Sequence, residues 1–266
     1  TLGALHRVGL SGDVGRLLGS DPDENPMRAE IRSAAALLRG PCFSVSHILG
    51  PPGHVLHVAA GEPDAVERVL ASEAERRFRV PEADAAQVVV AGNHPWPGDP
   101  LQSFKVLLHH RAASSAGGLL IGFFWTNPAE IDRSLSLGSL KRIAATGAVG
   151  GAVIRGGIRL ADLAMRAVKS PSAFLLRWAR ELVVDRTVLV YAPPLCERIG
   201  PWLGPVRLFS DQDLLWKAAK RALGGNAPRG VRLFPQGGLT YCREPEHRTE
   251  RPPLPASRFS ACGEVR

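Results

Sequence analysis

The chain has 266 residues, of which 45% are hydrophobic and 22% charged, and its formal net charge is +8. This is the composition of an ordinary globular protein, and it excludes wholesale disorder. The longest apolar run near the middle of the chain, from Leu119 to Trp125, is far shorter than the roughly 20 residues of a membrane-spanning helix, so we expect no membrane partner.

The first half of the sequence alternates helix and strand patterns. Asn25 and Pro26 have the residue types of a helix N-cap and first helical position. An apolar run over 86–91, bounded by Gly92, is typical of a buried parallel strand. The expected elements are a helix over 27–38, strands over 42–49 and 54–59, a helix over 63–77 and a strand over 86–91.

The second half continues this alternation and ends in a polar tail that contains several prolines. Ser210 or Asp211 is the expected N-cap of the last helix, which Gly224 and Gly225 end. The expected elements are a helix over 100–112, a strand over 119–124, helices over 128–134, 140–146, 162–168 and 173–182, strands over 187–191 and 206–209, a helix over 214–223 and a strand over 231–234.

Strands that alternate with helices predict an α/β fold with a mainly parallel sheet flanked by helices. Pro81 and Asp84 break the pattern, so we place a boundary near residues 80–86. The expected organisation is a first region over 1–82, an α/β domain over 83–242 and a flexible tail over 243–266.

The charge distribution and the spacing of the cysteines limit the classes of partner and the cellular compartment that we expect. The basic residues are scattered and no basic-aromatic motif accompanies them, so nucleic acid is not an expected partner, whereas a basic pocket for a small carboxylate or phosphate stays open. No two cysteines are two to four residues apart, so we expect no zinc cluster. Nothing indicates a disulfide framework, and we expect a reducing, cytoplasmic compartment.

The stretch after the strand over 86–91 carries the candidate binding site, because ligands of open α/β sheets bind beyond the carboxyl ends of strands. Gln102 and Lys105 share one face of the expected helix, in its first two turns, where the helix dipole favours an anion. An ammonium and an amide there would hold a small carboxylate. The spacing also fits a capping box of Asp99 and Gln102, with Lys105 as an ordinary surface cation, and it does not decide between the two.

Other residues near this site have simpler interpretations. His94 is interpreted as a turn residue, His109 as a packed or capping residue, and Trp96 as packing on the neighbouring helix rather than as a cover over substrate. The glycines between 147 and 157 could approach a phosphate, but no strand-Gly-x-Gly-x-x-Gly-helix unit contains them.

Several short motifs follow one another along the chain. They are Asn25-Pro26 at the start of an amphipathic helix, Ala60-Gly61-Glu62 after a strand pair, Val88-Val89-Val90-Ala91-Gly92, Asp99-x-x-Gln102-x-x-Lys105, and Gly117-Gly118-Leu119-Leu120-Ile121. Over roughly residues 5–240, this ordered series resembles the latter part of the nickel-pincer-nucleotide-dependent lactate racemase (LarA) family.

The resemblance implies a racemase or epimerase of a 2-hydroxy acid, either lactate or a larger analogue. Family members transfer a hydride between the substrate and a nickel-pincer nucleotide, so this cofactor and nickel are implied here. Gln102 and Lys105 match the family's Gln-x-x-Lys motif, which helps hold the substrate. Leu101 stands where a tyrosine often precedes that glutamine, which leaves open a substrate other than lactate.

The resemblance also implies that the cofactor-attaching lysine, both catalytic histidines and an arginine for the carboxylate belong to an earlier stretch. The chain is then expected to be a fragment without catalytic residues, and residues 1–82 a remnant of the cofactor-bearing domain. His6 precedes the Asn25-Pro26 motif at about the spacing of a nickel-ligating histidine in the family, and imidazole suits nickel. The alternative for His6 is an ordinary histidine near a chain end.

A different class of function also fits the sequence. The α/β unit could be a non-catalytic module that binds a small anion through the same two side chains. A preceding domain that carries histidine and lysine would favour the enzyme over the module. The oligomeric state does not follow from the sequence.

Overall fold

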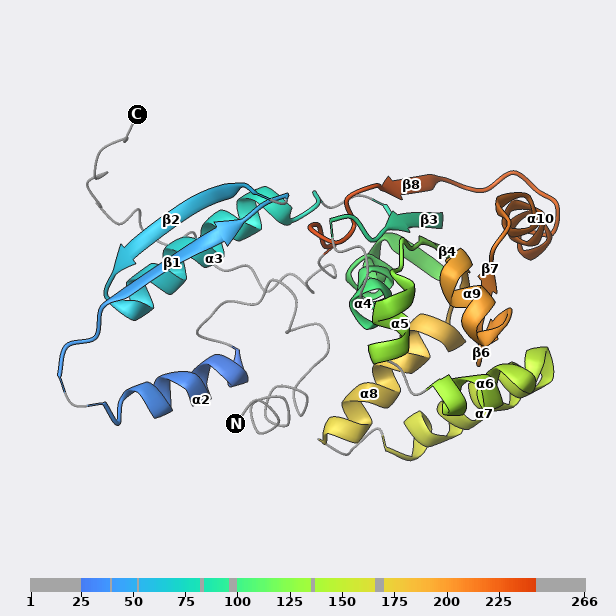
Figure 1. The fold of residues 1–266 in the computed structure, drawn as a ribbon, viewed down its shortest axis with the longest axis horizontal. Coiled ribbons are helices and arrows are strands. Elements are labelled where there is room, and N and C mark those ends of the chain that lie inside the picture. The colour runs from blue at the N-terminus through green and yellow to red at the C-terminus, as the bar shows by residue number, and fades with distance from the viewer. Residues whose placement is uncertain are drawn as a thin grey trace.

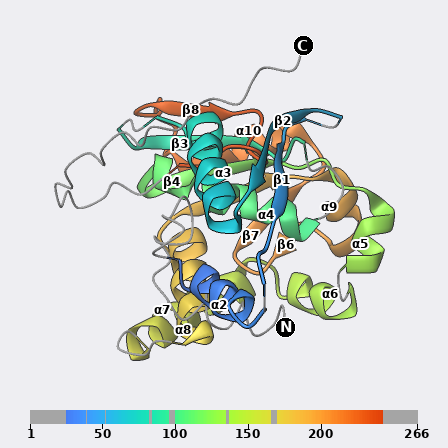
Figure 2. The same cartoon turned by 90° about the vertical axis from the view of Figure 1, so that its left-hand side faces the viewer.

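The computed structural model describes residues 25–38, 40–51, 53–81, 84–95, 100–134, 137–165 and 170–242. They form two separate sheets: an antiparallel pair, and a six-stranded sheet with the order β6-β7-β5-β4-β3-β8 (Figures 1 and 2). The pair consists of β1 (Ser44–Leu49) and β2 (Val55–Gly61), and the larger sheet of β3 (Ala86–Gly92), β4 (Ser114–Phe123), β5 (Thr187–Tyr191), β6 (Trp202–Leu203), β7 (Val206–Phe209) and β8 (Val231–Phe234).

The antiparallel pair packs against helix α3 (Pro63–Phe78), and ion pairs connect α3 to α2 (Pro26–Ala35). Asn25 caps α2 as the sequence predicts, because its Oδ1 accepts a hydrogen bond from the backbone N–H of Met27 at 3.0 Å. Glu62 caps α3 in the same manner, and these backbone hydrogen bonds lower the pKa of its carboxyl. Each helix therefore begins where a side chain takes up its unpaired N–H groups.

In the larger sheet, β3, β4, β5, β7 and β8 run parallel and the edge strand β6 runs antiparallel. The expected α/β fold with a mainly parallel sheet flanked by helices is confirmed. The helices are α4 (Pro100–His109), α5 (Pro128–Ser134), α6 (Leu137–Ala145), α7 (Gly147–Ala164), α8 (Pro171–Ala179), α9 (Pro193–Ile199) and α10 (Gln212–Ala222). None of the described helices is both long enough and apolar enough to cross a bilayer.

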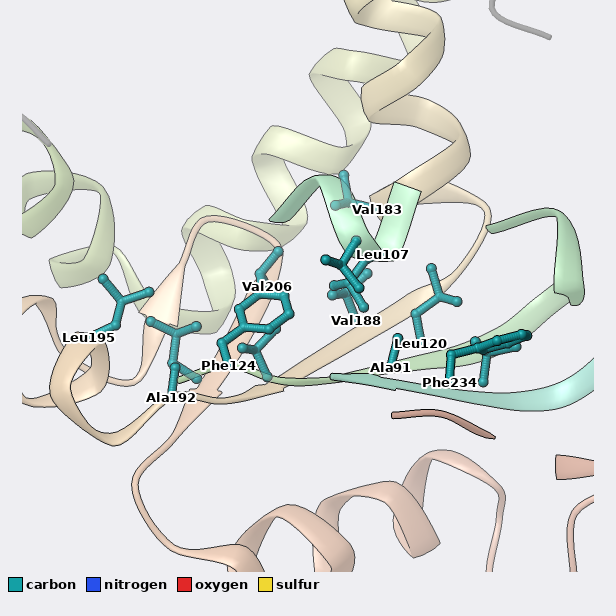
Figure 3. Close-up of a cluster of buried hydrophobic side chains, with 14 of the residues drawn as sticks. Ala91, Leu107, Leu120, Phe124, Val183, Val188, Ala192, Leu195, Val206 and Phe234 are labelled. Atoms are coloured by element: carbon teal, nitrogen blue, oxygen red, sulfur yellow. The ribbon is translucent and has the colours of Figure 1, made fainter. Parts of the chain in front are cut away.

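Buried apolar side chains form a separate cluster on each face of the six-stranded sheet, because side chains alternate along each strand. Val89 and Leu120 belong to the cluster that packs against α4, α5 and α9, part of which Figure 3 shows. Val88 and Leu119 belong to the cluster on the other face, where α10 packs through Leu215.

The glycines between 147 and 157 lie inside α7, which corrects two interpretations of the sequence. The prediction placed a helix only over 162–168, and it left open that these glycines approach a phosphate. Instead, Gly151 packs against the backbone of Gly204, where an added Cβ would lie 2.6 Å from the Gly204 carbonyl oxygen. Glycine has a low helix propensity, so the sequence pattern did not indicate a helix here. The close approach to Gly204 explains why a residue without a Cβ stands at position 151.

The chain order of the sheet places a topological switch point between β3 and β8. From β3 the chain proceeds through β4 and β5 to β7 in one direction, and after α10 it returns to β8 on the other side of β3. Ligands of open α/β sheets bind beyond the carboxyl ends of the strands at such a point.

Candidate functional site

The segments that follow β3 and β8 lie in direct contact at the switch point. The backbone N–H of Gly238 donates a hydrogen bond to the carbonyl of His94 at 3.0 Å. A Cβ on Gly92 would lie 2.7 Å from the carbonyl oxygen of Pro235, and one on Gly237 would lie 2.7 Å from the Gly92 carbonyl oxygen. Two glycines therefore let the turn after β8 lie against the end of β3.

Asn93, the first residue after β3, is buried and fixes α4 to the sheet. Its Nδ2 donates hydrogen bonds to Ser103 Oγ and to the carbonyl oxygen of Trp125, both at 2.8 Å. Its Oδ1 accepts a hydrogen bond from the backbone N–H of Trp125 at 2.9 Å. One side chain thus joins the end of β3, the start of α4 and the segment after β4.

Asn93 was assigned no role from the sequence. The sequence signal that could have identified it is its position, because it is a polar residue directly after a buried apolar strand, at the edge of the sheet where ligands bind. His110, below, was likewise interpreted only as part of a helix.

Gln102 and Lys105 lie together on the exposed face of α4, as their spacing predicts. Ser103 and Leu107, on the inner face of the helix, are buried. No carboxylate among the described residues forms an ion pair with Lys105. Asp99, which would form the alternative capping box, and Trp96 both lie outside the described residues. The structure shows where the two side chains lie; their role in binding stays a prediction.

His109 continues the stripe of Gln102 and Lys105 one turn further along α4. Burial lowers the pKa of His109 to about 4, and the neighbouring charges of His110, Lys105 and Arg111 act in the same direction. The imidazole is therefore neutral near neutral pH, so Lys105 carries the positive charge of this stripe.

His110 anchors the end of α4 to the segment after β8. Its Nδ1 lies 2.8 Å from the carbonyl oxygen of Val106, which can only accept, so Nδ1 carries the proton. Its Nε2 lies 3.0 Å from Thr240 Oγ1, and its ring lies on Phe234 with the centroids 4.2 Å apart. Burial lowers the pKa of His110 to about 4, and the hydrogen bond to Val106 opposes this.

The predicted nickel ligand, His6, lies outside the described residues. Within the described ranges, no three His, Cys, Asp or Glu side chains gather closely enough to hold a metal ion.

No protein-family model and no curated protein sequence matches the chain. Among solved structures, it is similar to the lactate racemase apoprotein from Thermoanaerobacterium thermosaccharolyticum, with a TM-score of 0.58 and 15% sequence identity. The similarity covers 91% of this chain and 55% of that chain, so the chain spans about half the length of this neighbour. At this identity the likeness shows the fold alone: the chain has a lactate racemase-like α/β fold.

Proposed function

We propose that this chain is the substrate-holding part of an isomerase of the lactate racemase type, a racemase or epimerase that acts on a small 2-hydroxy acid. The observation that carries the proposal is the pair of exposed side chains, Gln102 and Lys105, in the opening turns of the helix that follows β3 at the switch point. The likeness to a lactate racemase apoprotein supports it.

The chemistry of this pair suits a carboxylate. The Lys105 ammonium supplies a full charge, and the Gln102 amide supplies a directed donor and an acceptor that can also reach the adjacent hydroxyl. The dipole of α4 adds partial positive charge at its first turn. Because Asn93 and His110 hold the two ends of α4, the pair is presented on a rigid support, which favours a fixed orientation of the substrate.

The cofactor and the proton-transfer groups belong to the proposal through the resemblance alone. A nickel-pincer nucleotide would supply the hydride acceptor, and the earlier stretch that the resemblance implies would supply the catalytic histidines. The role of this chain is to bind the carboxylate and orient the α-carbon.

The direct test is isomerisation by the longest natural form of the protein, grown with nickel. Enantiopure lactate and larger 2-hydroxy acids are incubated with it, and the products are separated by chiral chromatography. The proposal predicts loss of enantiomeric purity for at least one of them. If nickel-loaded protein inverts none of them but binds them in calorimetry through Lys105, the chain is a small-anion-binding module and the isomerase proposal is wrong.

A further inference from the structure

The face of the six-stranded sheet opposite α4 is only partly covered by the described residues. There α10 packs over β5 and β7 through Leu215, Ala218 and Ala219. Val88, Leu119 and Ile121, on β3 and β4, are buried in the same cluster. The open part of this face lies over the edge strand β8, where Val231 and Leu233 remain 51% and 66% exposed. Parallel sheets are normally buried on both faces, so we expect another molecule to cover this open strip.

A groove of about 410 Å³ runs along the strip, between α10 and β8. The strand register builds its floor from two rows of aliphatic side chains, each row crossing β4, β3 and β8. Trp216 and Leu223 form the wall on α10. The rows are Leu119, Val88 and Val231, and Ile121, Val90 and Leu233.

The groove is apolar along its floor and cationic at one end. Lys220 is the charged side chain among its lining residues, and it also borders an adjoining hollow of about 520 Å³ together with Lys217 and Arg221. All three cations lie in the second half of α10, and no carboxylate of the described residues forms an ion pair with them. The acids of α10, Asp211 and Asp213, lie at its opposite end.

We propose that this groove binds a single-chain amphiphile, an aliphatic chain that ends in an anionic head group. The chain would lie along the two aliphatic rows, and the head would pair with Lys220, Lys217 and Arg221. The volume is within the range of small-molecule sites. The groove lies on the opposite face of the sheet from α4, so the proposal is independent of the isomerase function.

The helix of a second copy does not suit this groove. The exposed side of α10 carries Asp213 and Lys217 next to Leu214, which is 52% exposed. Laid into the partner's groove, that side would place two charges against aliphatic side chains, which removes them from water without compensation.

The test uses dodecanoate as the probe, below its micelle concentration, with the fluorescence of Trp216 as the signal. Trp216 forms part of the groove wall, 5.8 Å from the ring of Phe123 between centroids. We expect saturable binding with one site per chain, and loss of the fluorescence change in Trp216→Phe. Dodecyltrimethylammonium has the same chain and the opposite charge, and we expect it to bind at least 10-fold more weakly.

Two variants locate the site, each with a matched control. Leu233→Asp places a charge at the aliphatic row and should weaken dodecanoate binding at least 10-fold, whereas Val58→Asp, at a 59% exposed position on β2, should not change it. Lys220→Glu should weaken dodecanoate binding at least 10-fold and reverse the preference between the two head groups. Lys141→Glu on α6 should do neither.

Several results would overturn the proposal. They are binding that does not saturate, equal affinity for both head groups, and an unchanged affinity in Lys220→Glu. Lys220 is exposed, so Lys220→Glu decides the question even if Leu233→Asp does not fold. Sedimentation velocity provides the remaining outcome. A dimer of the unliganded protein that Leu233→Asp dissociates would assign the groove to a second copy instead.

Discussion

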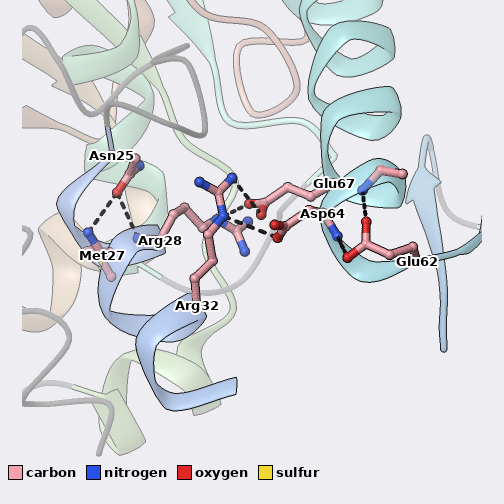
Figure 4. Close-up of polar contacts among 8 residues, drawn as sticks. Asn25, Met27, Arg28, Arg32, Glu62, Asp64 and Glu67 are labelled. Carbon is pink, nitrogen blue, oxygen red and sulfur yellow. Dashed lines mark hydrogen bonds and ion pairs between the residues drawn. The ribbon is translucent and has the colours of Figure 1, made fainter. Parts of the chain in front are cut away.

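The two sheets of this protein are held together by different forces. The six-stranded sheet has a cluster of buried apolar side chains on each face. Around the antiparallel pair, α2 buries no residue and α3 buries only Val66. Ion pairs join these two helices instead, Arg28 to Glu67 at 2.7 Å and Arg32 to Asp64 at 3.2 Å (Figure 4).

Buried apolar side chains therefore stabilise the six-stranded sheet domain by itself, whereas few buried apolar side chains stabilise the α2–α3 region. Surface ion pairs contribute about 0–1 kcal/mol each, and an isolated two-stranded sheet is marginal in water. The outer face of the pair carries Val45, Leu49, Val55 and Val58, all of them exposed apolar side chains. We therefore expect the two regions to respond separately to mutation, acid and salt.

The largest effect is expected in the core of the sheet domain. Phe124 is buried and packs edge-to-face against Phe104, with ring centroids 5.2 Å apart. Phe124→Ala should lower the free energy of unfolding by about 3–5 kcal/mol, because it leaves a cavity in a close-packed core. Urea unfolding followed by tryptophan fluorescence measures it. Val66→Ala is the comparison in α3, and equal losses at the two sites would contradict the separation of the regions.

The next effect concerns Asn93. Asn93→Ala removes three hydrogen bonds of a buried side chain, so we expect a loss of about 2–3 kcal/mol in unfolding free energy. Asn226→Ala, at an exposed position, should cost almost nothing. A stability loss no greater than that of Asn226→Ala would show that Asn93 does not fix α4.

Acid should separate the two regions. His110 and His109 have pKa values of about 4 in the fold against 6.5 for the free side chain, so the unfolded chain takes up more protons between these values. Stability of the sheet domain should fall as the pH drops from about 6.5 to 4, by up to about 3 kcal/mol for each histidine.

The carboxylate of Glu73 in α3, next to Arg76 and Arg77, has a pKa of about 2 against 4.5, so its contribution is lost only below about pH 4.5. Thermal melts from pH 7 to 2 check the order in which the two contributions are lost. His110→Gln should flatten the dependence between pH 6.5 and 4, and an unchanged slope would contradict the role of His110.

The smallest effect is expected from salt. Raising NaCl from 0.05 to 0.5 M should weaken the Arg28 and Arg32 ion pairs and change stability by less than about 1 kcal/mol. Hydrogen exchange should increase in α2 and stay constant in β4. Equal changes in both elements would show that the salt effect is not local to these ion pairs.

The local sequence pattern predicted the bounds of three strands of the six-stranded sheet, but it missed β6 and started β4 at Leu119 instead of Ser114. It was also insufficient for some of the helices. The strands over 187–191, 206–209 and 231–234 have the predicted bounds, because short apolar runs end at turn residues. Helix α9 was not predicted, although Pro193 and Pro194 stand in its first turn, where proline is accepted. Helix α7 was missed because of its glycines.

The same limit applies to the candidate site. The shared face of Gln102 and Lys105 follows from helical spacing alone. The roles of Asn93 and His110 do not, because their partners Trp125 and Thr240 lie 32 and 130 residues away along the chain. Local periodicity carries no information about such contacts.

We propose that Lys105 and Gln102 hold the carboxylate of a 2-hydroxy acid. The most direct test of this proposal is kcat/KM for isomerisation by the longest natural form of the protein with Lys105→Ala, measured beside Lys141→Ala on α6. The account predicts a 10- to 100-fold loss for Lys105→Ala, the size of a lost charge-assisted hydrogen bond of about 1.5–3 kcal/mol, and no loss for Lys141→Ala. Unchanged kinetics in Lys105→Ala would contradict it.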